Sequence, residues 1–81
     1  MQSQEKYAEL FRELGLRLKA LRKERGLSQE DMLSFGFSTR HWQQVESGRP
    51  VTLTTIFRVC DVFGVKPESI LSGLYSPKRT K

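Results

Sequence analysis

Apolar residues recur at alternating spacings of four and three along the first third of the chain. They are Tyr7, Phe11, Leu14, Leu18 and Leu21. Because this rhythm follows the repeat of an α-helix, it places the five side chains on one stripe. The pattern predicts a long first helix over residues 4–25, which Gly26 ends.

A shorter amphipathic segment follows this glycine. Ser28 stands three residues before Asp31, a spacing typical of a capping box at a helix start. We therefore expect a second, short helix from Gln29, with three inward side chains: Met32, Leu33 and Phe35. Gly36 then breaks the pattern, and since glycine adopts a positive φ at low steric cost, it permits a sharp reversal of the chain.

The stretch after this turn is mostly polar but holds two apolar residues three positions apart. Ser38 or Thr39 can cap a third helix in which Trp42 and Val45 lie on one face. Gly48 ends this helix. The opposite face carries only polar side chains and is a candidate for function.

Two further helices complete the pattern. Thr52 can cap a fourth helix, for which we expect five inward side chains: Leu53, Ile56, Phe57, Cys60 and Phe63. Gly64 suits its C-terminus, and Pro67 suits the first turn of a fifth helix that Gly73 closes. The sequence predicts an all-α fold, a compact five-helix bundle over residues 1–73, followed by a flexible basic tail over residues 74–81.

Size and composition narrow the class of protein. A chain of 81 residues forms one domain with a modest core, which agrees with self-association. No apolar run approaches the roughly 20 residues of a membrane span, and the N-terminal residues show no signal-peptide pattern. Cys60 is the only cysteine, so no internal disulfide can form, and we expect a cytoplasmic protein.

The net charge of +5 favours a polyanionic partner. Basic residues concentrate between positions 17 and 25 and in the tail PKRTK. A solvated helix face with a soluble tail explains the same charges equally well. Aromatic residues among basic ones can also stack on single-stranded nucleic acid, but Tyr7, Phe11, Phe57 and Phe63 fall at inward spacings, which predicts core positions.

Residues 28–50 read SQEDMLSFGFSTRHWQQVESGRP. This stretch resembles the helix-turn-helix of the lambda-repressor and Cro-like group, the XRE family. The matching features are Ser-Gln, acidic residues, an apolar pair, Gly-Phe-Ser, and an apolar residue three positions before Val-Glu-Ser-Gly. The likeness covers roughly residues 14–71. It implies a lambda-repressor-like bundle whose third helix enters the major groove of double-stranded DNA.

The resemblance assigns base contacts to three residues: Thr39, Arg40 and Gln44. Their chemistry fits, because arginine can bond guanine through two hydrogen bonds, glutamine can do so with adenine, and threonine offers a hydroxyl and a methyl group. It assigns contacts with the DNA backbone to five more: Gln29, Ser38, Gln43, Ser47 and Arg49. His41 is either a further phosphate contact or an exposed residue.

The resemblance also implies an ion pair between Arg22 of the first helix and Glu46 of the third. An acid in a DNA-binding helix would repel phosphate unless it faced the protein. We therefore expect a partly buried pair that ties the two helices together. Two unrelated surface charges are the alternative.

Three departures from the family pattern concern the site. The interval from Gln29 to Ser38 is one residue shorter than usual, so the second helix or the turn must be trimmed. Leu33 stands where the family usually has alanine, and Trp42 where it usually has isoleucine or valine. Base contacts assigned by register therefore depend on how the turn is rebuilt.

Together these features predict a sequence-specific transcriptional regulator, a homodimeric repressor on a pseudo-palindromic DNA site. It would act in the cytoplasm, at the nucleoid when bound. The alternative is a protein-interaction module or antitoxin-type partner with the same fold. We expect no enzyme, since no nucleophile–base pair or phosphate-cradling glycine loop is present, and neither a cofactor nor a metal, because one histidine and one distant cysteine cannot complete a zinc site.

Overall fold

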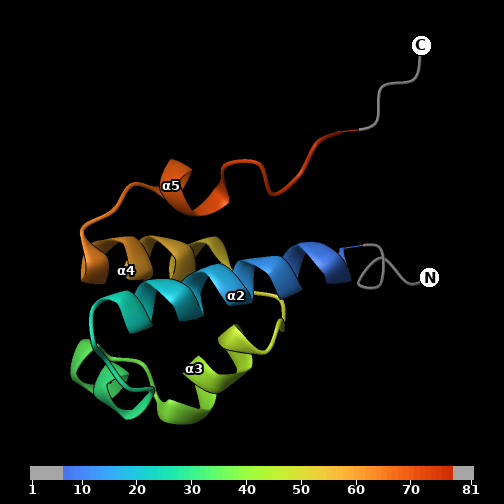
Figure 1. Ribbon diagram of the computed structural model, residues 1–81. Helices are drawn as coiled ribbons and strands as arrows, with labels where there is room; N and C mark the ends of the chain where they lie inside the picture. Colours follow the sequence, from blue (N-terminus) through green and yellow to red (C-terminus); the bar gives the residue numbers. More distant parts are fainter. Residues whose placement is uncertain (1–6, 78–81) are drawn as a thin grey trace.

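The computed structural model describes residues 7–77, and within this range the regular structure is entirely helical. The elements in chain order are α2 (Ala8–Glu24), the 3₁₀-helix η1 (Glu30–Phe35), α3 (Thr39–Glu46), α4 (Leu53–Phe63) and α5 (Pro67–Leu71) (Figure 1). The all-α, five-helix prediction is confirmed. The start of the first helix, predicted at residue 4, lies outside the described residues.

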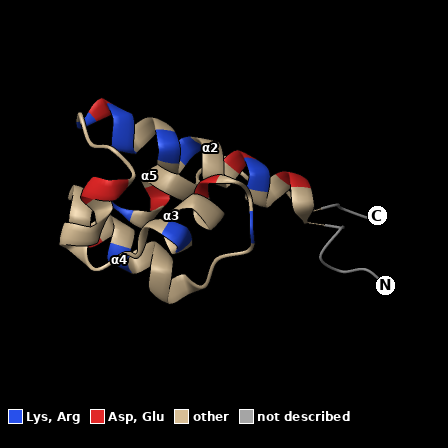
Figure 2. Cartoon of the chain, turned by 90° about the horizontal axis from the view of Figure 1, so that it is seen from below, with Lys and Arg blue, Asp and Glu red and all other residues tan. Residues whose placement is uncertain are grey.

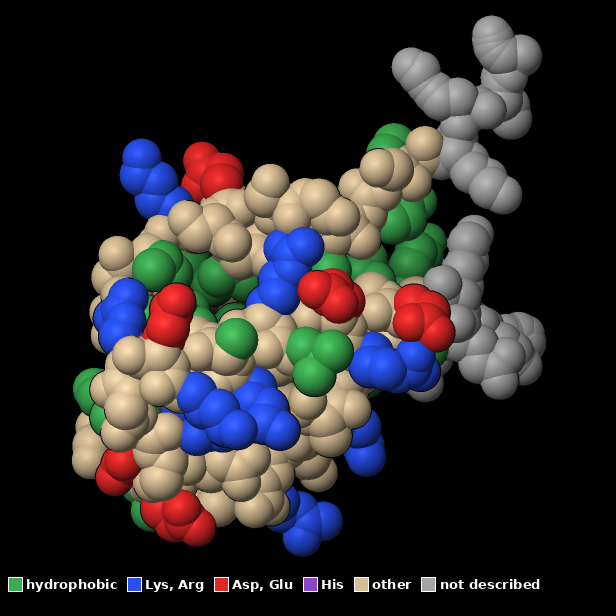
Figure 3. All heavy atoms as spheres, viewed as in Figure 1, with side chains coloured by type: hydrophobic (Ala, Val, Ile, Leu, Met, Phe, Trp, Pro, Cys, Tyr) green, Lys and Arg blue, Asp and Glu red, His purple; other side chains and the backbone are tan. Residues whose placement is uncertain are grey.

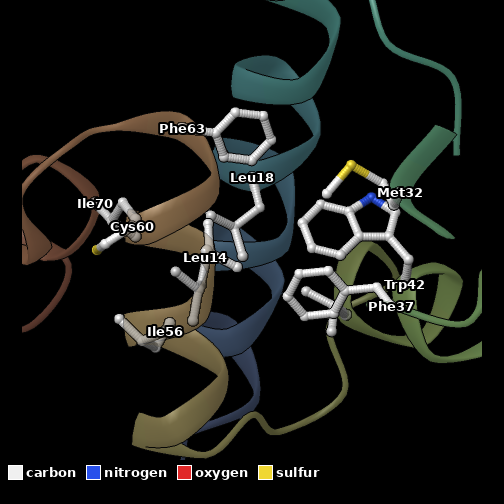
Figure 4. Close-up of a cluster of buried hydrophobic side chains, with 11 residues drawn as sticks. Leu14, Leu18, Met32, Phe37, Trp42, Ile56, Cys60, Phe63 and Ile70 are labelled. Carbon is white, nitrogen blue, oxygen red and sulfur yellow. The ribbon is translucent and has the colours of Figure 1, made fainter. Parts of the chain in front are cut away.

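Helix α2 is the central element of the bundle. In Figure 1, η1 and α3 lie on one side of α2, and α4 and α5 lie on the other. The buried side chains of Leu14 and Leu18 project from α2 between these two sides (Figure 4). They join one continuous core with Met32, Phe37, Trp42, Val45, Ile56, Val59, Cys60, Phe63 and Ile70.

Serine side chains accept hydrogen bonds from backbone amides at the starts of two short segments, η1 and α3. Ser28 and Asp31 form the predicted capping box, with Ser28 Oγ accepting from the Asp31 amide at 3.1 Å and the Asp31 carboxylate accepting from the Ser28 amide at 2.7 Å. Hydrogen bonds from Ser28 to the Asp31 carboxylate, above all the one from the Ser28 backbone amide, lower the pKa of Asp31. Ser38 Oγ accepts from the amide of His41 at 3.0 Å and so starts α3 at Thr39.

The predicted inward face of the second helix is partly wrong. Only Met32 is buried in η1, whereas Leu33 is 58% exposed and Phe35 is 43% exposed. Each residue of a 3₁₀-helix turns the chain by about 120°, so Leu33 points away from the direction of Met32. After Gly36, with a φ of 91°, the chain reverses, and Phe37 takes the buried place predicted for Phe35.

The inward face of α4 also needs correction, since Leu53 and Phe57 are exposed. The buried stripe of α4 consists of Thr55, Ile56, Val59, Cys60 and Phe63. Phe57 follows Ile56 and is therefore turned about 100° away from it, while Leu53 lies in the first turn of the helix. These two side chains form an apolar pair on the surface, which we call the α4 pair.

The ends of the described chain lie together. The prediction of Tyr7 as a core residue is wrong, since Tyr7 is 36% exposed. Its ring centroid lies 6.2 Å from that of Tyr75. Leu74 packs against the core. The first residues of the predicted tail therefore contact the bundle, while residues 78–81 lie outside the described residues. The domain boundary after residue 73 stays a prediction.

Candidate nucleic-acid interface

Helix α3 has one buried face and one open face. Trp42 and Val45 are almost completely buried, and the Phe37 ring lies 5.1 Å from that of Trp42. On the open face, Arg40 is exposed, and Thr39 and Gln44 are partly exposed. The two faces follow the predicted division of the helix into anchoring and contacting residues.

The three predicted base-contacting side chains are free to bind a partner. Thr39, Arg40 and Gln44 make no side-chain hydrogen bond or ion pair with any residue between 7 and 77. Arg40 therefore keeps all five guanidinium N–H donors for an outside acceptor. Figure 2 shows α3, which carries these three residues, beside α2 and its several Lys and Arg positions.

Arg22 and Glu46 form the ion pair that the resemblance implied. Arg22 Nε lies 2.6 Å from Glu46 Oε2, Arg22 Nη2 lies 3.0 Å from Glu46 Oε1, and both side chains are more than nine-tenths buried. A third donor of Arg22, Nη1, binds the carbonyl oxygen of Leu27 at 2.7 Å. The pair thus fixes α3 against α2, and Arg22 also holds the loop that follows α2.

The Glu46 carboxylate accepts two more hydrogen bonds. The indole Nε1 of Trp42 donates to Oε2, and the amide Nε2 of Gln29 donates to Oε1 at 2.9 Å. Burial raises the pKa of Glu46, but the hydrogen bonds from Arg22, Gln29 and Trp42 outweigh it, so the pKa lies below its ordinary value. The acid is therefore ionised and fully satisfied inside the protein, where it does not oppose an approaching phosphate.

Gln29 and Gln43, both predicted backbone contacts, are linked to each other. Gln43 Nε2 donates to Gln29 Oε1 at 3.2 Å, while Gln29 donates inward to Glu46. Each amide nitrogen keeps one N–H for another acceptor. The buried carboxylate thus orients Gln29, and Gln29 orients Gln43 on the outer edge of α3.

The remaining predicted backbone contacts differ in what they can donate. Ser38 Oγ accepts from His41 and keeps its own proton. The hydroxyl of Ser47, by contrast, already donates its proton to the carbonyl oxygen of Gln44 at 2.9 Å. Arg49 is exposed and has no side-chain partner in the described range. His41 is partly buried, with its ring 6.0 Å from that of Phe37.

The structure places Lys19 beside these residues, although the resemblance did not assign it a role. A recess of about 220 Å³ at the border of α2 and α3 is lined by Leu16, Lys19, Gln29, Gln43, Glu46 and Ser47. Lys19 precedes Arg22 by three residues, which places both on the α3 side of α2. This three-residue spacing is the sequence pattern from which the position of Lys19 could have been predicted.

Arg58 of α4 supports the turn before α3. Its Nη2 donates to the carbonyl oxygen of Gly36 at 2.7 Å, and its guanidinium lies 4.2 Å from the centre of the Phe37 ring. Both contacts hold the turn that sets the angle of α3. Twenty-two positions separate Arg58 from Gly36. No local pattern in the sequence marks this contact.

Neither a metal-binding group nor a membrane span is found among the described residues. They contain no cluster of three or more His, Cys, Asp and Glu side chains that could hold a metal ion. None of their helices is long and apolar enough to cross a bilayer. Cys60 is buried, and burial raises the pKa of its thiol.

A 3₁₀-helix, a turn on a left-handed glycine and a short helix with a polar outer face define a helix-turn-helix DNA-binding domain. A family model for helix-turn-helix domains matches residues 13–71, and the chain belongs to this family. The predicted lambda-repressor-like resemblance is confirmed at this level. No curated protein and no solved structure matches the chain.

Proposed function

We propose that this protein is a sequence-specific transcriptional regulator that binds double-stranded DNA and represses transcription as a homodimer. One observation carries the proposal: α3 is anchored by buried Trp42, Val45 and Glu46, while Thr39, Arg40 and Gln44 have no partner among the described residues. A rigid, anchored helix with free outward donors suits the reading of base edges in a major groove. Family membership supports DNA as the partner.

Within this proposal the polar residues divide into two roles. Thr39, Arg40 and Gln44 read bases, and Arg40 supplies the strongest contact because it can form two hydrogen bonds to guanine. The phosphate contacts are Gln29, Ser38, Gln43, Ser47 and Arg49. They raise affinity for every sequence.

The second part of the proposal is that the protein acts as a homodimer. The exposed α4 pair, Leu53 and Phe57, supports it, because burying these side chains against a second copy removes apolar surface from water. Two copies related by a twofold axis would set their α3 helices about 34 Å apart on a pseudo-palindromic site. Selection of bound duplexes from random DNA, with the mass of the complex measured, tests the site and the dimer together.

Arg40→Ala is expected to weaken binding to the selected site by about 1–3 kcal/mol and to relax the preference at one base pair. Arg49→Ala, the matched control, removes an equally exposed arginine and is expected to weaken all sequences alike. Titrations of both variants on the selected and on scrambled duplexes measure the difference. Equal losses on both duplexes for Arg40→Ala would show that it contacts phosphate rather than a base.

A second candidate function is a protein-interaction module or antitoxin-type partner. The exposed apolar side chains of Leu33 and Phe35 on η1 favour it, since they offer a surface to another protein. Salt distinguishes the two functions. DNA affinity is expected to fall steeply with rising salt as counterions are released, whereas a packed apolar interface changes little. We propose no catalytic activity and no cofactor under either function.

A further inference from the structure

One flank of α2 carries a row of exposed side chains that the helix-turn-helix does not use. They occur at spacings of four, three and four: Arg12, Leu16, Lys19 and Lys23. On a helix these spacings put all four on one side. The row is about 16 Å long at 1.5 Å per residue, about a third more than the roughly 12 Å width of a major groove.

This flank lies directly beside the C-terminal end of α3. Gly15 allows the close approach, since a Cβ there would lie 2.7 Å from the carbonyl oxygens of Val45 and Glu46. Gly48 approaches the other end of the row, where a Cβ would lie 3.2 Å from the Cα of Arg12. The cations of α2 and the exit of α3 therefore form one continuous surface.

Positive charge is concentrated on this surface, and two of its lysines have no acidic partner in the described range. Figure 3 shows Lys and Arg side chains gathered near the middle of the face on which Figure 1 has α2 above α3. Lys19 and Lys23 make no ion pair with any residue from 7 to 77. Glu46 lines the same recess as Lys19, but its carboxylate is already bound by Arg22, Gln29 and Trp42.

We propose that this flank of α2 is a second DNA-binding element, which holds the phosphodiester backbone bordering the groove that α3 enters. The inference rests on the proposed function. Lys19 and Lys23 each neutralise a phosphate, and the free N–H groups of Gln29 and Gln43 add hydrogen bonds beside Lys19. The negative backbone is the occupant because the row is cationic and continuous with the reading face.

Glu9 restrains the far end of this row. Its carboxylate lies 2.7 Å from Arg12 Nη1, and both side chains are largely exposed. The acid competes with a phosphate for the same guanidinium. Arg12 therefore contributes to DNA binding only after it exchanges Glu9 for the backbone.

The test compares two double variants that each remove two positive charges. Lys19→Ala/Lys23→Ala alters the proposed flank. Arg25→Ala/Lys66→Ala is the control, since Arg25 lies over the Phe63 ring of α4 and Lys66 precedes α5. Dissociation constants are measured for the selected duplex and a scrambled duplex at several salt concentrations.

Because each neutralised phosphate contributes about 0.9 to the slope of log affinity against log salt, the flank variant is expected to lose a slope of about 1.8. Between roughly 50 and 200 mM salt, wild type would then lose about tenfold more affinity than this variant. The scrambled duplex should show the same difference. A flank variant with the slope of the control overturns the inference but leaves the proposed function intact, whereas a wild-type protein that binds no duplex overturns both.

A gain of binding provides an independent check. Glu9→Gln frees Arg12 and is expected to strengthen binding to both duplexes at low salt. Glu13→Gln makes the same charge change next to Arg17, whose Nη1 donates to the carbonyls of Ile70 and Ser72 on the α5 side of the bundle. Equal affinities for the two variants would exclude Arg12 from the proposed contact.

Discussion

Replacing Glu46 with alanine is expected to lower the free energy of unfolding by about 3–5 kcal/mol. The variant leaves the Arg22 guanidinium buried without its counter-ion, and Trp42 and Gln29 lose the acceptor for their N–H groups. An unpaired buried charge costs more than the pair contributes, so the loss far exceeds that of a surface ion pair. Chemical denaturation monitored by circular dichroism measures it.

Glu24→Ala is the matched control, because it removes an exposed acid from the last turn of α2, outside the ion pair. We expect a change within about 0.5 kcal/mol for this variant. A loss below about 1 kcal/mol for Glu46→Ala would mean that solvent reaches the pair and compensates the arginine.

The same carboxylate gives stability a defined dependence on pH. The pKa of Glu46 in the folded protein lies below its ordinary value of 4.5. Its contribution is therefore fully present above that value and is lost as the pH falls through the folded pKa. Melting temperatures measured below pH 4.5 should fall less steeply for Glu46→Gln than for wild type, since the amide does not titrate. Parallel curves would contradict this assignment.

Gly15→Ala is expected to lower the free energy of unfolding by about 3 kcal/mol and to weaken DNA binding. The new Cβ would lie 2.7 Å from the carbonyl oxygens of Val45 and Glu46. These are backbone atoms of α3, so this helix must move away from α2 to relieve the contact. Thermal denaturation and titration with the selected duplex measure the two effects.

Gly26→Ala separates this steric effect from the general cost of replacing a glycine. Its φ is 72°, and a Cβ there meets no atom within 4 Å. We expect a loss of about 1–2 kcal/mol from the left-handed backbone alone, with DNA affinity unchanged at temperatures where both proteins are folded. Unchanged binding by Gly15→Ala would show that α3 keeps its angle despite the added methyl group.

The sequence predicted the features that depend on local spacing. Capping residues and glycines located the helices, and the 3.6-residue rhythm identified Leu14, Leu18, Trp42 and Val45 as buried. The fold class followed from these elements. The ion pair of Arg22 with Glu46 followed from the family resemblance, because no local rule joins residues 24 positions apart.

Local rules failed where neighbouring elements decide which face is covered. Phe35 and Phe57 were predicted to face inward, but Phe37, just after the turn at Gly36, and Val59 are buried instead. Arg58 was missed for the same reason, since its contact with Gly36 exists only after α4 has packed. The base-contacting roles of α3 await the DNA-binding measurements.

The placement of α2 between the two halves of the bundle has a consequence for cooperativity. Leu14 and Leu18 face α3 and α4 through the same few turns, so neither half possesses a hydrophobic interior of its own. Fraying of α3 would expose Trp42 and uncover the part of the shared core that α3 covers. We therefore expect the molecule to unfold as a single unit, and hydrogen exchange should show a common rate for buried amide protons in α3 and α4.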